Sequence, residues 1–328
     1  MTENILEIKN LEIEYKLKGK YLEAIKNINL SIKKGEVFGL VGESGSGKST
    51  LGRAVLRLLP ASSRINNAKI IFKKENLLKL SEKEMNNMIR GKEIAMVMQN
   101  PHNALNPVFK IGKQILDVLY FKSEKKKNRK ELKNRAVEFL KKVGISDPEY
   151  RFNEYPYQFS DGMKQRVMLA MAFISDPALL IADEATTALD LTVEAQILNL
   201  LANLVEEFKT SILYISHDIG VVAGLSDRIG VMYAGRIVEI AKTKDIISVP
   251  NHPYTEALLR CLPDYQKKDK LITIPGKVPD LGEQPTGCNF NPRCKYSFMR
   301  CRKKEPPLKK ISSEHYSACF LNERKKEK

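Results

Sequence analysis

Residues 42–50 constrain the fold of this chain more than any other segment. They fit the pattern G-x-x-x-x-G-K-[ST], which holds phosphate groups through backbone amides when it joins a strand to a helix. A short apolar run at 36–41 precedes the motif, and a helical pattern follows over 51–59. Strand, glycine loop and helix in this order predict a phosphate-binding site in an α/β protein.

Each residue type in this loop has a chemical role. Glycines let backbone N–H groups approach phosphate oxygens closely. The Lys48 ammonium would reach the β- and γ-phosphates, and the Ser49 hydroxyl would coordinate Mg²⁺. The positive end of the following helix adds to the attraction. The predicted ATP-binding residues of the loop are Gly42, Glu43, Ser44, Gly45, Ser46, Gly47, Lys48, Ser49 and Thr50.

A second apolar run ends in two carboxylates. Residues 179–182 are apolar, and Asp183 and Glu184 follow them directly. Asp183 at a strand end would hold the metal and its waters, and Glu184 would orient the attacking water or accept its proton. Gln99 and His217 each follow another predicted strand. Taken alone, each could equally be an ordinary loop, capping or core residue.

The chain divides into segments with different patterns. Its first 35 or so residues alternate apolar and polar positions, which predicts antiparallel strands. Residues 100–177 are mainly helical, and two lysine-rich helices are expected at 111–121 and 128–143. A helical block between two halves of an α/β core indicates two lobes. Prolines and cysteines after residue 249 mark a separate C-terminal segment.

Composition limits the class of protein. The 328 residues can bury a sizeable core, and 43% hydrophobic with 29% charged residues is typical of a soluble globular protein. No apolar stretch is long enough to span a bilayer and no secretory signal is visible, so a cytoplasmic protein is expected. The net charge of +16 leaves an anionic partner open. Its lysine runs lack interleaved aromatics, so solvated lysines are favoured and no nucleic acid is expected.

In this order the motifs resemble those of the ABC ATPase family over about residues 5–240. The glycine loop matches the Walker A motif, Gln99 the Q-loop glutamine, and His217 the switch histidine. Asp183 and Glu184 match the Walker B aspartate and the catalytic glutamate. The resemblance implies that ATP and Mg²⁺ bind here, that the magnesium site includes Ser49, Gln99 and Asp183, and that Tyr15 stacks on adenine.

Two further motifs, the signature and the D-loop, also match the family. Family members act as dimers, in which each ATP lies between the Walker motifs of one subunit and the signature of the other. The signature segment is 159–166, and the D-loop follows the Walker B strand. The resemblance assigns to the signature Ser160, Asp161, Gly162 and Met163. It assigns to the D-loop Ala188, Leu189 and Asp190.

Segments 158–168, 181–190 and 292–294 resemble the D-type ATPase of oligopeptide and dipeptide importers, and Met163 favours the D-type over its F-type paralogue. The implied fold is a P-loop NTPase with a RecA-like core, an antiparallel β subdomain, a helical signature subdomain (about 100–177) and a small C-terminal cysteine-containing domain. The expected boundaries are 1–245 for the ATPase domain and 246–328 for the C-terminal domain.

The implied function is ATP hydrolysis that energises peptide uptake, by a peripheral subunit on the cytoplasmic side of the cell membrane. Nickel and glutathione remain open as cargo. The implied partners are two transmembrane permeases, an extracytoplasmic peptide-binding protein, and a second ATPase that is either an F-type paralogue or another copy of this chain. A soluble ABC protein that acts on ribosomes or DNA is the rival, which the single cassette and the lack of sustained heptads disfavour.

Two positions depart from the family pattern. Asp161 replaces the first signature glycine, and Ala185 replaces the proline after the catalytic glutamate. A carboxylate where amides normally face the γ-phosphate would repel it, unless Asp161 points away. We therefore expect the partner's ATP site, which this signature completes, to be the weaker one, and Glu184 to carry most of the turnover.

Four of the five cysteines lie late in the chain. Disulfides are disfavoured in a reducing compartment, and the spacings match neither a zinc knuckle nor the common ferredoxin runs. Spacing alone leaves a metal site and four unlinked thiols open. The importer ATPases carry a Gly-Cys…Pro-Arg-Cys…Cys…His-x-x-x-Cys element here, and this resemblance implies a structural [4Fe–4S] cluster, with Zn²⁺ as the runner-up. Its ligands would be Cys288, Cys294, Cys301 and Cys319, whereas Cys261 lies outside the element.

Overall fold

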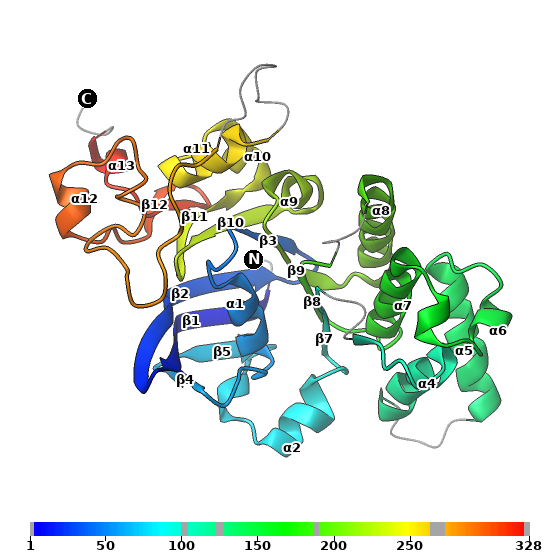
Figure 1. Ribbon diagram of the computed structural model, residues 1–328. Coiled ribbons are helices and arrows are strands. Elements are labelled where there is room, and N and C mark those ends of the chain that lie inside the picture. The colour runs from blue at the N-terminus through cyan, green and yellow to red at the C-terminus, as the bar shows by residue number, and fades with distance from the viewer. Residues whose placement is uncertain (1–2, 100–103, 123–127, 186–189, 263–272, 325–328) are drawn as a thin grey trace. The chain divides into compact units, whose positions relative to one another are not determined.

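The computed structural model describes residues 3–99, 104–122, 128–185, 190–262, 273–324, and it divides into two compact units (Figure 1). The first unit combines Met1–Leu78 with Tyr214–Lys328, and the second unit is Lys79–Leu213. The second unit is thus an insertion in the sequence of the first.

An antiparallel sheet forms the N-terminal part of the first unit, as the alternating pattern predicted. Its strand order is β2-β1-β5-β6, and β4 also pairs with β1. Lys18 and Gly19, both with positive φ, make the tight turn between β1 and β2. One face is apolar, since Leu6, Ile8 and Leu11 are at most 1% exposed. The strands are β1 (Asn4–Leu17), β2 (Lys20–Lys33), β4 (Ser63–Asn66), β5 (Lys69–Phe72) and β6 (Glu75–Asn76).

A second set of strands in the first unit runs in the order β12-β13-β11-β10-β3. All five residues of β3 are buried, and β3 pairs in parallel with β10. This buried strand leads directly into the glycine loop, so the loop starts from a rigid support. The strands are β3 (Val37–Val41), β10 (Arg228–Tyr233), β11 (Arg236–Lys242), β12 (Lys309–Ser312) and β13 (His315–Ser317).

The helix after the glycine loop, α1 (Lys48–Val55), is shorter than the 51–59 pattern predicted. It begins with Gly47 as its N-cap, at φ 102°, and ends before Arg57, which has a positive φ. The prediction was wrong at the C-terminal end because Arg57 leaves helical geometry in a tight turn. The other helices of this unit are α9 (Ile219–Leu225), α10 (Thr243–Ser248), α11 (Pro253–Arg260), α12 (Met299–Lys303) and α13 (Leu321–Arg324).

The second unit is mainly helical, with two parallel strands (Figure 1). The two predicted lysine-rich helices are confirmed as α4 and α5. The rings of Phe139 and Phe173 each lie 5.7 Å from that of Phe208, which joins α5, α7 and α8 through their apolar faces. The elements are β7 (Ile94–Val97), α4 (Ile111–Lys122), α5 (Arg129–Lys142), α6 (Pro148–Arg151), α7 (Asp161–Phe173), β8 (Leu179–Asp183) and α8 (Leu191–Phe208), after a short α2 (Glu82–Glu84). Strand β9 (Ser211–Ser216) begins in this unit and ends in the first.

Within the first unit, a buried carboxylate on β11 binds the C-terminal segment. Glu239 is fully buried and accepts hydrogen bonds from the backbone N–H groups of Asn251 (2.6 Å) and His252 (3.0 Å). A ring nitrogen of His315, on β13, lies 2.7 Å from the same carboxylate. These bonds offset the cost of burying the charge and fix the loop before α11 against the strands.

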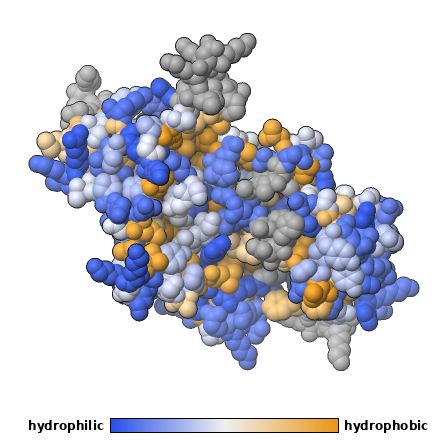
Figure 2. Space-filling view, in the orientation of Figure 1, coloured by the Kyte–Doolittle hydropathy of each residue, from blue (hydrophilic) through white to orange (hydrophobic). Residues whose placement is uncertain are grey.

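Hydrophobic residues lie among hydrophilic ones on the face shown in Figure 2. No helix in the described part of the chain combines the length and the apolar character needed to cross a bilayer.

Candidate functional site

The glycine loop lies between β3 and α1, as predicted. Gly42 is buried, and a Cβ added there would lie 2.1 Å from the main-chain oxygen of Met232 on β10. Gly45 and Gly47 have φ values of 79° and 102°, a region that favours glycine. The Ser46 carbonyl accepts a hydrogen bond from the Gly235 N–H (2.9 Å), which fixes the loop against the β10–β11 turn.

The chemistry of the loop suits a polyphosphate. The Lys48 ammonium is almost fully buried and donates to the carbonyls of Gly42 (2.7 Å) and Glu43 (3.0 Å). Among the described residues the buried Ser46 hydroxyl has no hydrogen-bond partner. Ser44 and Gly45 are exposed, so the loop is open to solvent. Together with the first amides of α1, these groups provide positive charge and donors for phosphate oxygens.

Two other predicted residues belong to the first unit. Tyr15 lies on β1, and its hydroxyl oxygen is 3.2 Å from that of Thr50, so the proposed adenine-stacking residue is next to the loop. His217 is exposed and follows β9 directly. The next residue, Asp218, caps α9 by accepting from the Gly220 N–H (2.7 Å).

In the second unit the structure brings Gln99 and Glu184 together. The parallel strands β7 and β8 pair Val97 with Ala182, so the residues beyond them leave the same edge of the pair. The Gln99 amide donates to a Glu184 carboxylate oxygen at 2.6 Å. Glu184 has a φ of 49°, which is strained for a non-glycine residue. Asp183, the last residue of β8, is 3% exposed.

The signature segment forms the start of α7. Ser160 is the N-cap, and its hydroxyl accepts from the Met163 N–H (3.3 Å). The Asp161 carboxylate pairs with the Lys164 ammonium of the next turn (3.0 Å). A Cβ on Gly162 would lie 2.8 Å from Val193 of α8, so the signature glycine also permits close helix packing.

The D-loop prediction falls partly outside the described residues, which do not include Ala188 and Leu189. Asp190 is described. It caps α8 by accepting from the Val193 N–H (2.9 Å).

Comparison with known proteins decides the family. The family profile "ABC transporter" matches residues 25–187, and "Oligopeptide/dipeptide transporter, C-terminal region" matches residues 238–301. The oligopeptide transport ATP-binding protein OppD of Bacillus subtilis is 47% identical over 97% of this chain and 88% of its own length. The chain belongs to the ABC transporter family of ATP-binding proteins. A second relative of this ABC transporter ATPase, the dipeptide transport ATP-binding protein DppD of Escherichia coli, is 42% identical over 96% of both chains.

Solved ABC cassettes share the fold. The ATP-binding cassette MJ0796, a dimer in a post-hydrolysis state bound to ADP and Pi, superposes with a TM-score of 0.65 at 29% identity, over 73% of this chain and 98% of its own. The cbiO1 protein of Clostridium perfringens, part of the ABC transporter complex cbiONQ, gives 0.64 at 27% identity, over 75% and 92%. The predicted ABC ATPase fold is confirmed.

The four late cysteines of this ABC transporter ATPase line one small cavity, which also has apolar walls from Phe290 and Phe320. Burial raises the pKa of Cys288 to about 11 and of Cys319 to about 12, and it also raises that of Cys294. These three thiols therefore stay protonated unless a cation compensates their thiolate charges.

The donor groups of the cysteine cavity suit a metal centre, but its volume in this structure is too small for an iron–sulfur cluster. No group of three or more His, Cys, Asp or Glu side chains in the described ranges is arranged to hold a metal ion. The cavity has a volume of about 10 Å³, which is about the space for one water molecule. Four thiols with no carboxylate among them are nevertheless the donor set that iron–sulfur clusters use. A cluster would require the surrounding loops to move apart.

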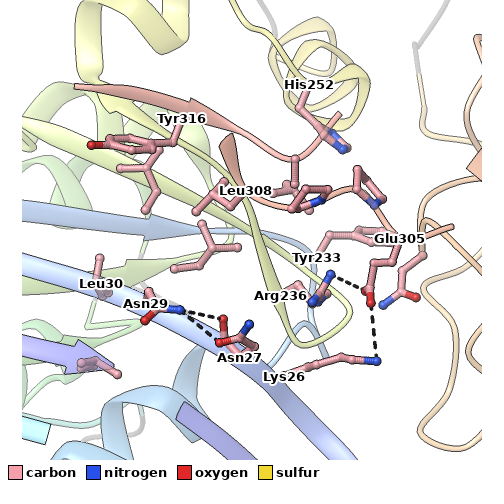
Figure 3. Close-up of a pocket in the computed structure, with 18 of the residues that line it drawn as sticks. Lys26, Asn27, Asn29, Leu30, Tyr233, Arg236, His252, Glu305, Leu308 and Tyr316 are labelled. Carbon is pink, nitrogen blue, oxygen red and sulfur yellow. Dashed lines mark hydrogen bonds and ion pairs between the residues drawn. The ribbon is translucent and has the colours of Figure 1, made fainter. Parts of the chain in front are cut away.

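A larger cavity of about 760 Å³ lies in the first unit between β1, β2, β11 and the C-terminal segment (Figure 3). Three charged side chains meet at one side of this cavity: the Glu305 carboxylate pairs with Arg236 and lies 3.5 Å from the Lys26 ammonium (Figure 3). No residue of 42–50 lines this cavity, so it is distinct from the phosphate site. His252, Cys288 and Phe290 line both this cavity and the cysteine cavity.

Sequence reasoning missed the residues that contact the glycine loop from the C-terminal segment. Arg293 forms two hydrogen bonds to the Glu43 carboxylate (2.9 and 3.0 Å), and the Glu43 N–H donates to the Tyr254 hydroxyl (2.8 Å). The sequence singles out Arg293 only as part of Pro292-Arg293-Cys294, and Glu43 only as one of the predicted ATP-binding residues of the loop. No pattern in the chain joins residues 250 positions apart.

Proposed function

We propose that this chain is the ATP-hydrolysing subunit of an ABC importer that energises uptake of peptides across the cytoplasmic membrane. The observation that carries the proposal is the phosphate-binding loop joined in one chain to a C-terminal region of the oligopeptide/dipeptide type. Relatives named for oligopeptide and dipeptide transport match nearly the whole chain, which favours peptides over nickel or glutathione as cargo.

The uptake experiment uses the transporter purified through this chain and reconstituted with its binding protein in vesicles. ATP-dependent accumulation of a labelled dipeptide or a labelled longer peptide supports the proposal. Accumulation of nickel or glutathione alone would contradict the peptide cargo, and co-purification with ribosomes instead of permeases would favour the soluble rival.

The residues of each unit are assigned separate tasks. Lys48 binds the β- and γ-phosphates, Ser49 and Asp183 are the magnesium ligands together with Gln99, and Tyr15 contacts adenine. Mg²⁺, when bound, neutralises phosphate charge. Glu184 holds the attacking water and accepts its proton, while the Gln99 amide donates to one of its oxygens at 2.6 Å and orients the carboxylate.

His217, which follows β9, is assigned to the γ-phosphate side of the site. We place the boundary between the ATPase domain and the C-terminal domain at about residue 245, with a helical subdomain at about 100–177. The partners are two permeases, a peptide-binding protein outside the membrane, and a second ATPase of F-type or a second copy of this chain. The subunit is peripheral, on the cytoplasmic face.

The signature contributes to the partner's ATP site, and Ala188, Leu189 and Asp190 are assigned to the D-loop, of which the described residues include only Asp190. Asp161 is the first residue of α7, where a carboxylate interacts favourably with the helix dipole, and it pairs with Lys164. The Asp161 side chain is half exposed, so Lys164 compensates its charge only in part. We therefore propose that the site this signature completes is the weaker of the two.

We further propose that Cys288, Cys294, Cys301 and Cys319 hold a [4Fe–4S] cluster with a structural role. Their convergence on a single apolar cavity supports the proposal. Iron would compensate the charge of four thiolates, and burial raises the pKa of three of these thiols, Cys288, Cys294 and Cys319. A cluster would also crosslink a segment whose elements are short, such as α12 and β13.

Replacing Cys294 by serine is expected to remove the cluster. Protein purified without oxygen should contain about four iron and four sulfide per chain and be brown. Cys294→Ser should lose most of the iron and the colour, whereas the matched control Cys261→Ser should keep both, because Cys261 does not line the cavity. Zinc in place of iron would select the runner-up, and the absence of both metals would contradict a metal centre.

A further inference from the structure

The second residue of the glycine loop, Glu43, is bound by the C-terminal segment through its carboxylate and its backbone N–H. Both carboxylate oxygens of Glu43 accept from Arg293, and its N–H donates to Tyr254. Its carbonyl accepts from the Lys48 ammonium (3.0 Å) and from the Ser46 N–H (3.2 Å). The position of Glu43, and with it the path of the loop, therefore depends on two side chains more than 200 residues away in the sequence.

Arg293 is itself fixed by its surroundings. Besides its two bonds to Glu43, it donates to the carbonyls of Pro275 (2.8 Å) and Ile274 (3.3 Å) and to the Tyr233 hydroxyl (3.3 Å). An arginine has five N–H donors, and all five are used here. The side chain is 5% exposed. Such a planar, two-point pair is geometrically specific, and lysine cannot reproduce it.

Three aromatic rings pack around Arg293, and one of them, Tyr233, belongs to strand β10. The rings of Tyr233, Tyr254 and Phe290 lie 4.7 to 5.3 Å from one another. The guanidinium lies over Tyr233 (5.7 Å) and Phe290 (5.9 Å). Burial, with the charge of Glu43, raises the pKa of Tyr254 well above its ordinary value, so its hydroxyl stays neutral. This packing leaves Arg293 little freedom to move.

Arg293 neutralises a carboxylate that lies in the phosphate-binding loop. Without its partner, the Glu43 charge would repel an incoming triphosphate, and the side chain would lose both of its bonds to the C-terminal segment. With the pair formed, the local charge is neutral and the loop is held in one conformation before ATP arrives. Preorganisation of this kind lowers the cost of binding.

We propose that Arg293 is a positioning residue for the phosphate-binding loop, acting through Glu43, so that the C-terminal segment sets the affinity of the subunit for ATP. The inference rests on the proposed function, because it assumes that residues 42–50 bind the phosphates of ATP. It makes the C-terminal segment part of the nucleotide site rather than an appendage.

The test measures binding of the fluorescent probe MANT-ATP with Mg²⁺ to the full chain, together with KM and kcat in the assembled transporter. Arg293→Gln should raise the Kd and the KM by about tenfold or more and change kcat by less than about threefold, since the pair acts on binding rather than on the chemical step. Arg293→Lys should show the same defect, because the charge without the planar fork does not hold the loop.

Two further variants separate positioning from structural support. Arg300→Gln is the matched control: this arginine pairs with Glu323 within the C-terminal segment (2.6 Å), so its loss should leave the Kd unchanged. The double variant Glu43→Gln/Arg293→Gln should bind no more weakly than Arg293→Gln, because the two side chains act as one unit.

Several results would overturn the inference. A lower melting temperature of Arg293→Gln with unchanged Kd would show that Arg293 only docks the segment. Normal binding by Arg293→Lys would reduce its role to charge, and additive losses in the double variant would show independent roles. Failure of the unmodified chain to bind the probe would instead contradict the proposed function.

Discussion

Replacing Glu184 by glutamine is expected to lower the ATPase rate of the assembled transporter by about a hundredfold or more, the usual contribution of a general base. Glutamine has nearly the same shape and keeps an oxygen that can accept from Gln99, so the 2.6 Å contact can persist. It cannot take a proton from the attacking water. Binding of MANT-ATP should therefore remain close to normal while phosphate release, measured by a coupled assay, nearly stops.

The paired variant Asp161→Gly tests the asymmetry of the two ATP sites. It removes the Asp161 carboxylate, whose charge Lys164 compensates only in part. We expect the ATPase rate of the assembled transporter to rise by only a few-fold, because the interaction free energy of an exposed charge is small. A small loss in Glu184→Gln, or no gain in Asp161→Gly, would contradict the assignment of most turnover to the Glu184 site.

Gly42→Ala is expected to weaken binding of ATP by about tenfold or more and to destabilise the first unit, because each hydrogen bond lost to a charged phosphate costs about 1.5–3 kcal/mol. The new methyl group would lie 2.1 Å from the Met232 carbonyl oxygen, which is main chain and cannot rotate away. Strand β10 cannot retreat easily, since its Val231 pairs with Val41 at the end of β3. The loop must move instead.

The matched control for Gly42→Ala is Gly224→Ala in α9, where an added Cβ meets nothing within 4 Å. Alanine is also the better helix former, so this variant should be as stable as the unmodified chain or slightly more so. Titration with MANT-ATP and thermal unfolding compare the two. Normal affinity of Gly42→Ala would show that the close contact with Met232 does not determine the path of the loop.

The sequence predicts the parts of this site that are local. The phosphate loop is readable because a buried strand, glycines and a lysine must follow one another within a few residues, and β3 and α1 lie where that order requires. The long helices α4, α5 and α8 follow from their apolar periodicity. The Asp161–Lys164 pair was not predicted, although its spacing of three residues on a helix is one at which side chains meet.

Long-range and short elements escaped prediction. The strands β12 and β13 have four and three residues, too few for a periodic signal, and they form because β11 offers an edge to pair with. The bonds from Arg293 and Tyr254 to Glu43 depend on how the C-terminal segment packs, which no local pattern states. The strain at Glu184 also depends on the turn after β8 and is visible only in the structure.

The central claim is that the loop at 42–50 takes up the triphosphate of ATP, and the most direct measurement is titration of the purified chain with Mg²⁺ and MANT-ATP. We predict saturable binding that Lys48→Ala weakens by at least about tenfold, because the ammonium between two loop carbonyls is the charge that meets the phosphates. A surface control, Lys20→Ala, should bind normally. No saturable binding by the unmodified chain, or the same affinity in Lys48→Ala, would contradict the account.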